Sequence, residues 1–150
     1  MQNSANLNQN PAAGNPDGCR RKVLLLVDDS HYSRALYGTA LRGAGFHVVE
    51  VCSGWEAQRA TEETGHFDLL VTDYLMPGMS GGRLADWFHR QRPRTGVLIY
   101  SSSPECVQRA ARNLPFADCM AASPNIAEFV ACVRTVLDQH ACPLPVSGLS

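Results

Sequence analysis

The sequence predicts an α/β domain, in which a doubly wound, five-stranded parallel sheet is covered by five helices. Short apolar runs such as 23–27 and 69–71 are typical of strands buried on both faces. These runs alternate with longer segments of helical periodicity, and strands that alternate with helices form parallel sheets. A chain of 150 residues that is 45% hydrophobic is expected to form a single core.

The expected elements follow one another in strict alternation. Strands are predicted at residues 23–27, 46–52, 69–73, 97–100 and, weakly, 118–121. Helices are predicted at about residues 31–42, 55–64, 82–91, 104–114 and 126–137. Ser30, Ser53 and Asn125 are suited to cap three of the helices, because their side chains accept hydrogen bonds from free backbone N–H groups. The buried face of the first helix is expected to comprise Tyr32, Leu36, Thr39 and Ala40.

The two ends of the chain differ from its middle. Residues 1–20 are rich in Asn, Gln, Pro, Ala and Gly and are expected to form a disordered N-terminal tail. Residues 141–150 contain two prolines and no periodic pattern, so they are expected to be a C-terminal tail. The predicted domain therefore spans residues 21–140.

Composition argues against several classes of protein. The net charge of −1 and the pI near 6.5 provide no basic surface for nucleic acid, so we expect no direct DNA binding. No apolar run is long enough for a membrane span or a signal peptide, which makes the cytoplasm the expected location. The six cysteines are scattered without a Cys-x-x-Cys pair, which favours free thiols over disulfides or zinc.

Three carboxylates follow predicted strands. Asp28 and Asp29 come directly after the first strand, and Asp73 ends the third. Right-handed crossovers bring these strand ends, and Ser101 after the fourth strand, to one edge of the sheet, where ligands bind in such folds. Carboxylates about 5 Å apart repel by roughly 3 kcal/mol per pair at an effective dielectric near 20, so a cation or a bound proton is needed. Hard oxygen ligands at an open edge favour Mg²⁺, and an ionised aspartate can act as a nucleophile toward phosphorus.

The sequence resembles the receiver domains of two-component response regulators over about residues 21–140. The resemblance rests on Val-Asp-Asp at 27–29, Thr-Asp-Tyr-Leu-Met-Pro-Gly-Met-Ser-Gly at 72–81, and Ser101, which lies 28 positions after Asp73. It implies the flavodoxin-like receiver fold with strand order 2-1-3-4-5. It also implies a signalling protein rather than an enzyme.

The resemblance assigns a role to each matching residue. Asp73 is implied to be the phosphoacceptor. Asp28, Asp29 and Asp73 are implied to bind Mg²⁺, together with the backbone carbonyl of Leu75. Ser101 is implied to be the switch hydroxyl that moves toward the phosphoryl group.

The match to the family is incomplete at the end of the fifth strand. Receivers carry a lysine before a proline there, whereas this chain has Ser123 before Pro124, and Met120 stands where the aromatic switch residue is expected. The only lysine, Lys22, lies at the opposite end of the first strand, roughly 17 Å from the acids. A charge-assisted hydrogen bond contributes about 1.5–3 kcal/mol, compared with roughly 5.5 kcal/mol needed to switch a two-state domain. We therefore expect phosphorylation to be coupled only weakly to conformation.

These observations predict a stand-alone receiver, because only about ten residues follow the last helix. Its phosphoryl donor is expected to be a histidine kinase or a phosphotransfer protein. Its output is expected to be a protein bound by the surface of residues 104–114, 118–121 and 126–137, and a homodimer is left open. The alternative is a receiver-like interaction module that signals without phosphate. A serine hydrolase using Ser80 in Gly-x-Ser-x-Gly is disfavoured, because Pro77 separates this segment from the strand.

Overall fold

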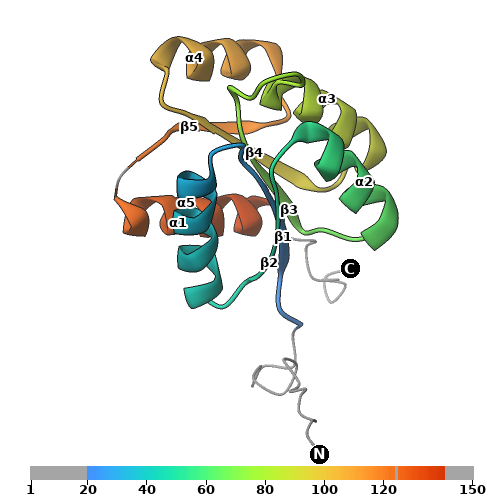
Figure 1. The fold of residues 1–150 in the computed structure, drawn as a ribbon, viewed down its shortest axis with the longest axis vertical. Coiled ribbons are helices and arrows are strands. Elements are labelled where there is room, and N and C mark those ends of the chain that lie inside the picture. Colours follow the sequence, from blue (N-terminus) through green and yellow to red (C-terminus); the bar gives the residue numbers. More distant parts are fainter. Residues whose placement is uncertain (1–19, 124, 141–150) are drawn as a thin grey trace, which may run out of the picture.

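Five parallel strands form one sheet in the order β2-β1-β3-β4-β5, as predicted (Figure 1). The computed structural model describes residues 20–123 and 125–140. The strands are β1 (Val23–Val27), β2 (His47–Val51), β3 (Leu69–Asp73), β4 (Gly96–Ser101) and β5 (Asp118–Ala121). The helices are α1 (His31–Gly43), α2 (Gly54–Thr64), α3 (Gly81–Gln91), α4 (Pro104–Asn113) and α5 (Ile126–Gln139).

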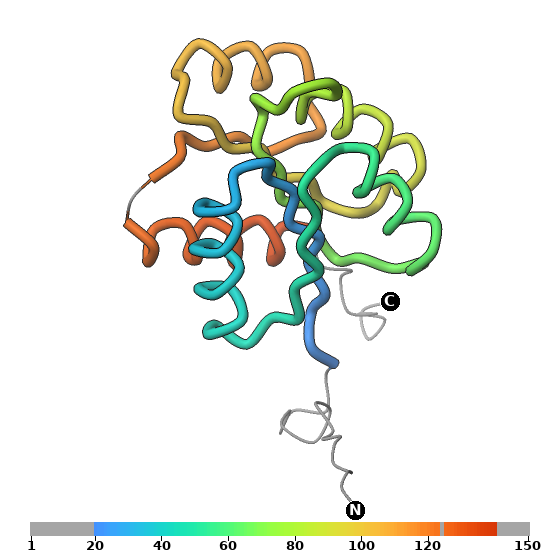
Figure 2. The backbone as a smooth tube through the Cα atoms, in the orientation of Figure 1, coloured from blue at the N-terminus to red at the C-terminus, as the bar shows by residue number. Residues whose placement is uncertain are grey.

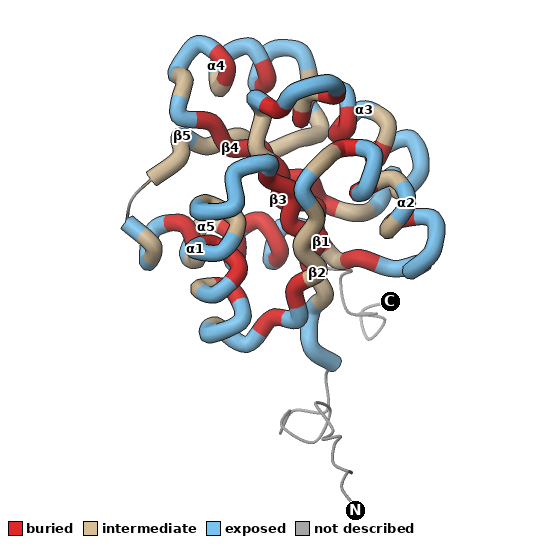
Figure 3. The backbone as a smooth tube through the Cα atoms, in the orientation of Figure 1, coloured by how far each residue is buried: buried red, intermediate tan, exposed pale blue. Residues whose placement is uncertain are grey.

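Helices cover both faces of the sheet. Helices α1 and α5 lie on one face, and α2, α3 and α4 lie on the other, as the backbone trace shows (Figure 2). Because alternate residues of a strand point to opposite faces, Leu24 and Leu26 pack in the core under α1 and α5. Leu25 and Val27 pack in the second core, under the other three helices. The central strands are accordingly the most buried part of the molecule (Figure 3).

Side chains that precede the helices cap them. Ser30, Ser53 and Asn125 each accept a hydrogen bond from a backbone N–H of the first helical turn, which confirms the three predicted caps. Ser80 and Ser103 cap α3 and α4 in the same way. A satisfied N-terminus contributes about 1 kcal/mol per helix and fixes where the helix begins.

The predicted buried face of α1 is wrong. Tyr32 is 76% exposed and Leu36 is 37% exposed, whereas Tyr37 and Leu41 are buried against the sheet. This helix carries apolar residues on two sides, so its periodicity fits more than one orientation. Packing of the Tyr37 ring against other aromatic rings selects the face that is buried.

Strand β5 is the short edge of the sheet. It has four residues, none of them fully buried, and it pairs with β4 from Leu98↔Asp118 to Ser101↔Ala121. The predicted tails fall almost wholly outside the described residues, and the domain limits of 21 and 140 stay predictions.

No helix in the described part of the chain is both long and apolar enough to cross a membrane.

Candidate functional site

The three predicted acids meet at the carboxyl-terminal edge of the sheet. Val27 of β1 pairs with Thr72 of β3, so Asp28 and Asp73 follow as neighbours on adjacent strands. One carboxylate oxygen from each of Asp28, Asp29 and Asp73 lies within 4.8 Å of the others. We call these three residues the acid cluster. Its geometry suits one small cation held by oxygen ligands.

Asp28 is the buried member of the acid cluster, with 1% of its surface exposed. Its Oδ1 accepts a hydrogen bond from the Ser30 N–H at 2.9 Å, and its Oδ2 accepts one from the Tyr100 hydroxyl at 2.5 Å. Arg34 of α1 donates to the main-chain carbonyl of Asp28 at 2.6 Å. Burial raises the pKa of Asp28, and the hydrogen bonds from Tyr100 and Ser30 act against this rise.

The carboxyl group of Asp73 has a strongly raised pKa. Burial, followed by the negative charges of Asp28 and Asp29, raises its pKa to about 7. Hydrogen bonds with the backbone of Leu75 and Tyr74 lower the pKa only in part. Full ionisation of the acid cluster is therefore unfavourable unless a cation or a proton lies among the carboxylates, as the charges and spacing predict.

Ser101 and Leu75 lie where the sequence places them. Ser101 ends β4 and is 1% exposed, and its hydroxyl oxygen accepts a hydrogen bond from the Ser103 N–H at 3.1 Å. Leu75 follows β3, and its side chain is 53% exposed. The switch role of Ser101 and the ligand role of the Leu75 carbonyl stay predictions.

Ser123 serves a different purpose from a phosphate-binding lysine. Its hydroxyl donates to Glu128 Oε1 at 3.0 Å and accepts from the Asn125 N–H at 3.0 Å. Ser123 therefore stabilises the start of α5. Lys22 precedes β1, at the edge opposite the acid cluster, as predicted.

Sequence reasoning missed Tyr100 and Arg34, which both contact Asp28. Tyr100 was predicted only as the last residue of an apolar strand, and its hydroxyl was given no partner. Nothing in the local sequence links Tyr100 to Asp28, which lies 72 positions earlier. A polar atom at the end of a strand, next to predicted site residues, is the signal that could have found it.

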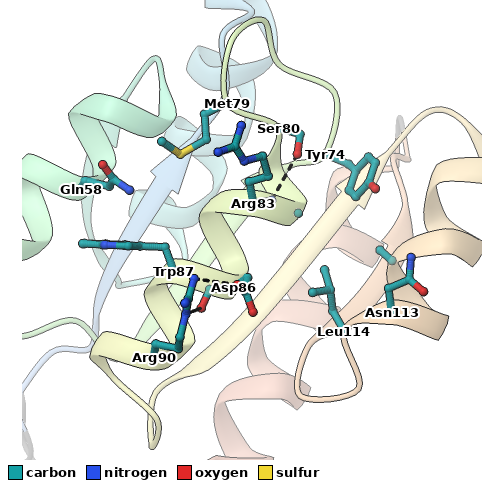
Figure 4. A pocket seen from close by; sticks show the side chains of 12 residues that line it. Gln58, Tyr74, Met79, Ser80, Arg83, Asp86, Trp87, Arg90, Asn113 and Leu114 are labelled. Carbon is teal, nitrogen blue, oxygen red and sulfur yellow. Dashed lines mark hydrogen bonds and ion pairs between the residues drawn. The ribbon is translucent and has the colours of Figure 1, made fainter.

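A separate cavity of about 380 Å³ runs along α3 (Figure 4). Its lining includes Tyr74, Trp87 and Leu114, and none of the acid cluster. Ser80 also borders this cavity, where it accepts a hydrogen bond from the Arg83 N–H at 3.2 Å. Ser80 thus acts as a helix cap, which agrees with the rejection of the hydrolase hypothesis.

The sequence of this chain matches the model of one protein family. The response regulator receiver domain matches residues 24–116. The chain belongs to this family. Receiver domains are signalling modules of two-component systems, and phosphoryl acceptance on an aspartate is general in the family. The predicted family and fold are therefore confirmed.

Several known proteins that resemble this receiver are longer, and the match covers only part of each. The sensor kinase CckA of Brucella abortus is 36% identical over 94 residues, which are 62% of this chain and 10% of that protein. The transcriptional regulatory protein TcrA of Mycobacterium tuberculosis is 30% identical over 135 residues, covering 89% of this chain and 52% of that protein. The chain thus spans about half or less of these relatives.

Solved structures share the receiver fold. A CheY-like receiver domain protein from Methanospirillum hungatei superimposes with a TM-score of 0.72 at 23% identity, covering 80% of this chain and 96% of that one. The response regulator TrrA from Thermotoga maritima, solved in complex with Mg²⁺ and BeF, gives a TM-score of 0.68 at 24% identity. That match covers 77% of this chain and 98% of the other.

Proposed function

We propose that this receiver accepts a phosphoryl group on Asp73 from a histidine kinase or a phosphotransfer protein. The observation that carries the proposal is the convergence of the Asp28, Asp29 and Asp73 carboxylates within 4.8 Å. Two relatives, one named a sensor kinase and the other a transcriptional regulatory protein, support a role in such signalling.

The acid cluster fits Mg²⁺ in charge and in ligand type. Its donors are carboxylate oxygens, and the pKa of Asp73 is raised to about 7 by burial and by its two acidic neighbours. A divalent ion would hold Asp73 in its ionised form at neutral pH. We assign Asp28, Asp29, Asp73 and the Leu75 carbonyl as its ligands. When bound, Mg²⁺ supplies positive charge that offsets the charges of the acids and of the phosphoryl oxygens.

The chemical step belongs to Asp73. One of its carboxylate oxygens attacks phosphorus and forms a P–O bond, while the bond from phosphorus to the donor's histidine nitrogen breaks and its electron pair stays on that nitrogen. Ser101 is buried at the end of the neighbouring strand β4. Its hydroxyl proton can be donated to a phosphoryl oxygen, which makes Ser101 the proposed switch residue.

The proposed output is a protein bound by the α4–β5–α5 surface. We expect the coupling between Asp73 and this surface to be weak, because Ser123 uses its hydroxyl to stabilise α5 and offers no ammonium group. That the chain works as a single domain, without direct DNA binding, stays a prediction.

An adduct experiment tests the proposal. The full chain is incubated with acetyl phosphate and Mg²⁺, and its intact mass is recorded. We expect a single phosphoryl adduct that is lost in Asp73→Asn and retained in the matched variant Asp86→Asn, which changes an exposed acid paired with Arg90. Absence of an adduct, or an adduct that persists in Asp73→Asn, would refute the proposal.

The contacts of Ser123 also favour a second candidate, an interaction module whose binding surface does not respond to phosphate. Amide hydrogen exchange with and without beryllofluoride distinguishes the two candidates. Changes in α4, β5 or α5 support the switch. Changes limited to the loops around Asp73 support the second candidate.

A further inference from the structure

Tyr100 connects the core of the sheet to the acid cluster. It is the last residue but one of β4, its side chain is 2% exposed, and its backbone pairs with Asp73 of β3. From there its hydroxyl reaches Asp28, at the end of β1, and donates to Oδ2 at 2.5 Å. Through its backbone and its side chain, Tyr100 thus links residues at the ends of three adjacent strands.

The Tyr100 ring is fixed by two other aromatic rings. Tyr37 of α1 meets it edge-on with ring centroids 5.2 Å apart, and Phe129 of α5 does so at 5.9 Å. Tyr37 and Phe129 stack on each other at 4.1 Å. All three rings are buried, so the Tyr100 hydroxyl has little freedom to leave Asp28.

The two hydrogen bonds to Asp28 determine how its carboxylate can bind a cation. Oδ1 accepts from the Ser30 N–H and Oδ2 accepts from Tyr100. A carboxylate oxygen has two lone-pair sites, so each oxygen keeps one for another partner. With one donor fixed on each oxygen, the plane of the carboxylate is set before a cation arrives. Partners of this kind orient metal ligands in many proteins, and their loss typically weakens metal binding by about 10–100-fold.

We propose that Tyr100 is a positioning residue of the metal site, whose hydroxyl holds Asp28 in the orientation that binds the divalent cation. This inference rests on the proposed function, because it assumes that the acid cluster binds Mg²⁺. Neither Ser123 nor Lys22 supplies a donor to the acid cluster, because the Ser123 hydroxyl donates to Glu128 and Lys22 lies at the opposite edge of the sheet. Tyr100 thus supplies the acid cluster with a hydrogen-bond donor from within the core.

Two tyrosine variants test the role of this one oxygen atom. Tyr100→Phe removes the hydroxyl and keeps the ring. Tyr37→Phe is the matched control, because Tyr37 belongs to the same aromatic group but donates its hydroxyl proton to the Ser123 carbonyl at 3.3 Å and not to a carboxylate of the acid cluster. Calorimetric titration of the full chain with Mg²⁺ at pH 7 should show binding about 10-fold weaker in Tyr100→Phe, and within about twofold of wild type in Tyr37→Phe.

A kinetic readout separates positioning from general loss of structure. With acetyl phosphate, Tyr100→Phe should form the Asp73 adduct slowly at low Mg²⁺ and at the wild-type rate when Mg²⁺ is saturating. Equal Mg²⁺ affinity in Tyr100→Phe and wild type would overturn the inference, as would equal weakening in the two tyrosine variants. If wild type binds Mg²⁺ but forms no adduct, only the proposed phosphoacceptor role fails. If wild type binds no Mg²⁺, the inference fails together with the metal assignment.

A measurement on the wild-type protein covers the case in which Tyr100→Phe does not fold. The Tyr100 hydroxyl proton should give a slowly exchanging NMR resonance that shifts on Mg²⁺ addition, more than that of Tyr37. A Tyr100 hydroxyl proton that does not respond to Mg²⁺, in a protein that binds the ion, would also overturn the inference.

Discussion

Gly81, the first residue of α3, lies directly against the main-chain carbonyl of Asp73. A Cβ atom at position 81 would overlap the Asp73 carbonyl oxygen and lie 2.9 Å from its carbonyl carbon. The Gly81 N–H also donates to the Tyr74 carbonyl at 2.8 Å. The start of α3 therefore packs against the backbone that carries the proposed phosphoacceptor, and only glycine fits there.

The Gly81→Ala substitution should destabilise the protein by about 1–3 kcal/mol, because the added methyl group pushes against backbone that cannot rotate away. It should also slow adduct formation at Asp73 by displacing that residue. Urea unfolding and intact mass measure the two effects. The control is Gly43→Ala at the end of α1, where a Cβ meets nothing within 4 Å, and stability should be unchanged or higher. Equal stability of Gly81→Ala and wild type would contradict the packing argument.

Asp73 should make the metal-free protein less stable as pH rises. Burial and the acids Asp28 and Asp29 raise its folded-state pKa to about 7, from 3.8 for an ordinary aspartate. Between about pH 4 and pH 7 the folded state therefore still holds a proton that the unfolded state has already released. As pH rises through that window, Asp73 progressively lowers the free energy of unfolding. Asp73→Asn should be more stable than wild type by about 1–3 kcal/mol at pH 8 and nearly equal to it at pH 4. Denaturant unfolding at a series of pH values tests this, and a difference that is independent of pH would contradict it.

Asp68, at the other end of the sheet, should have the opposite pH dependence. Burial raises its pKa, but hydrogen bonds from the Val23 N–H at 2.8 Å, from His66 and from Arg20 outweigh burial and lower the pKa. Its contribution to stability is present above pH 4 and is lost as pH falls through the lowered folded-state pKa. Asp68→Asn should cost about 1–3 kcal/mol at pH 7 and much less at pH 3. An equal loss at both pH values would show that the carboxylate charge is not what stabilises the start of β1.

Ser101 should affect signalling more than phosphorylation. Ser101→Ala removes the acceptor of the Ser103 N–H, a loss of about 1 kcal/mol in the free energy of unfolding. We expect the Asp73 adduct to form in this variant, while the changes in hydrogen exchange of α4 and β5 become smaller. Ser101→Thr keeps the hydroxyl and should retain those changes. If Ser101→Ala responds to beryllofluoride as wild type does, the switch role is excluded.

The sequence was sufficient for the elements and the acid cluster because their signals are local. Apolar runs end at Asp28 and Asp73, and the crossover rule brings these strand ends together without further information. The capping serines likewise act on backbone three residues away. What was missed depends on contacts between distant segments. Tyr37, and not the predicted Tyr32, lies on the buried face of α1, because aromatic rings from β4 and α5 pack against Tyr37.

We expect the short edge strand β5 to open before the central strands of the sheet. Its four residues share hydrogen bonds with β4 alone, and the Ser123 carbonyl that follows is joined to α1 through Tyr37. Local fluctuations cost least where few apolar groups are covered, so this margin should exchange its amide protons well before β1 and β3 do. A protein that binds along β5 would therefore contact a less buried edge of the sheet, whereas the acid cluster follows the buried central strands β1 and β3.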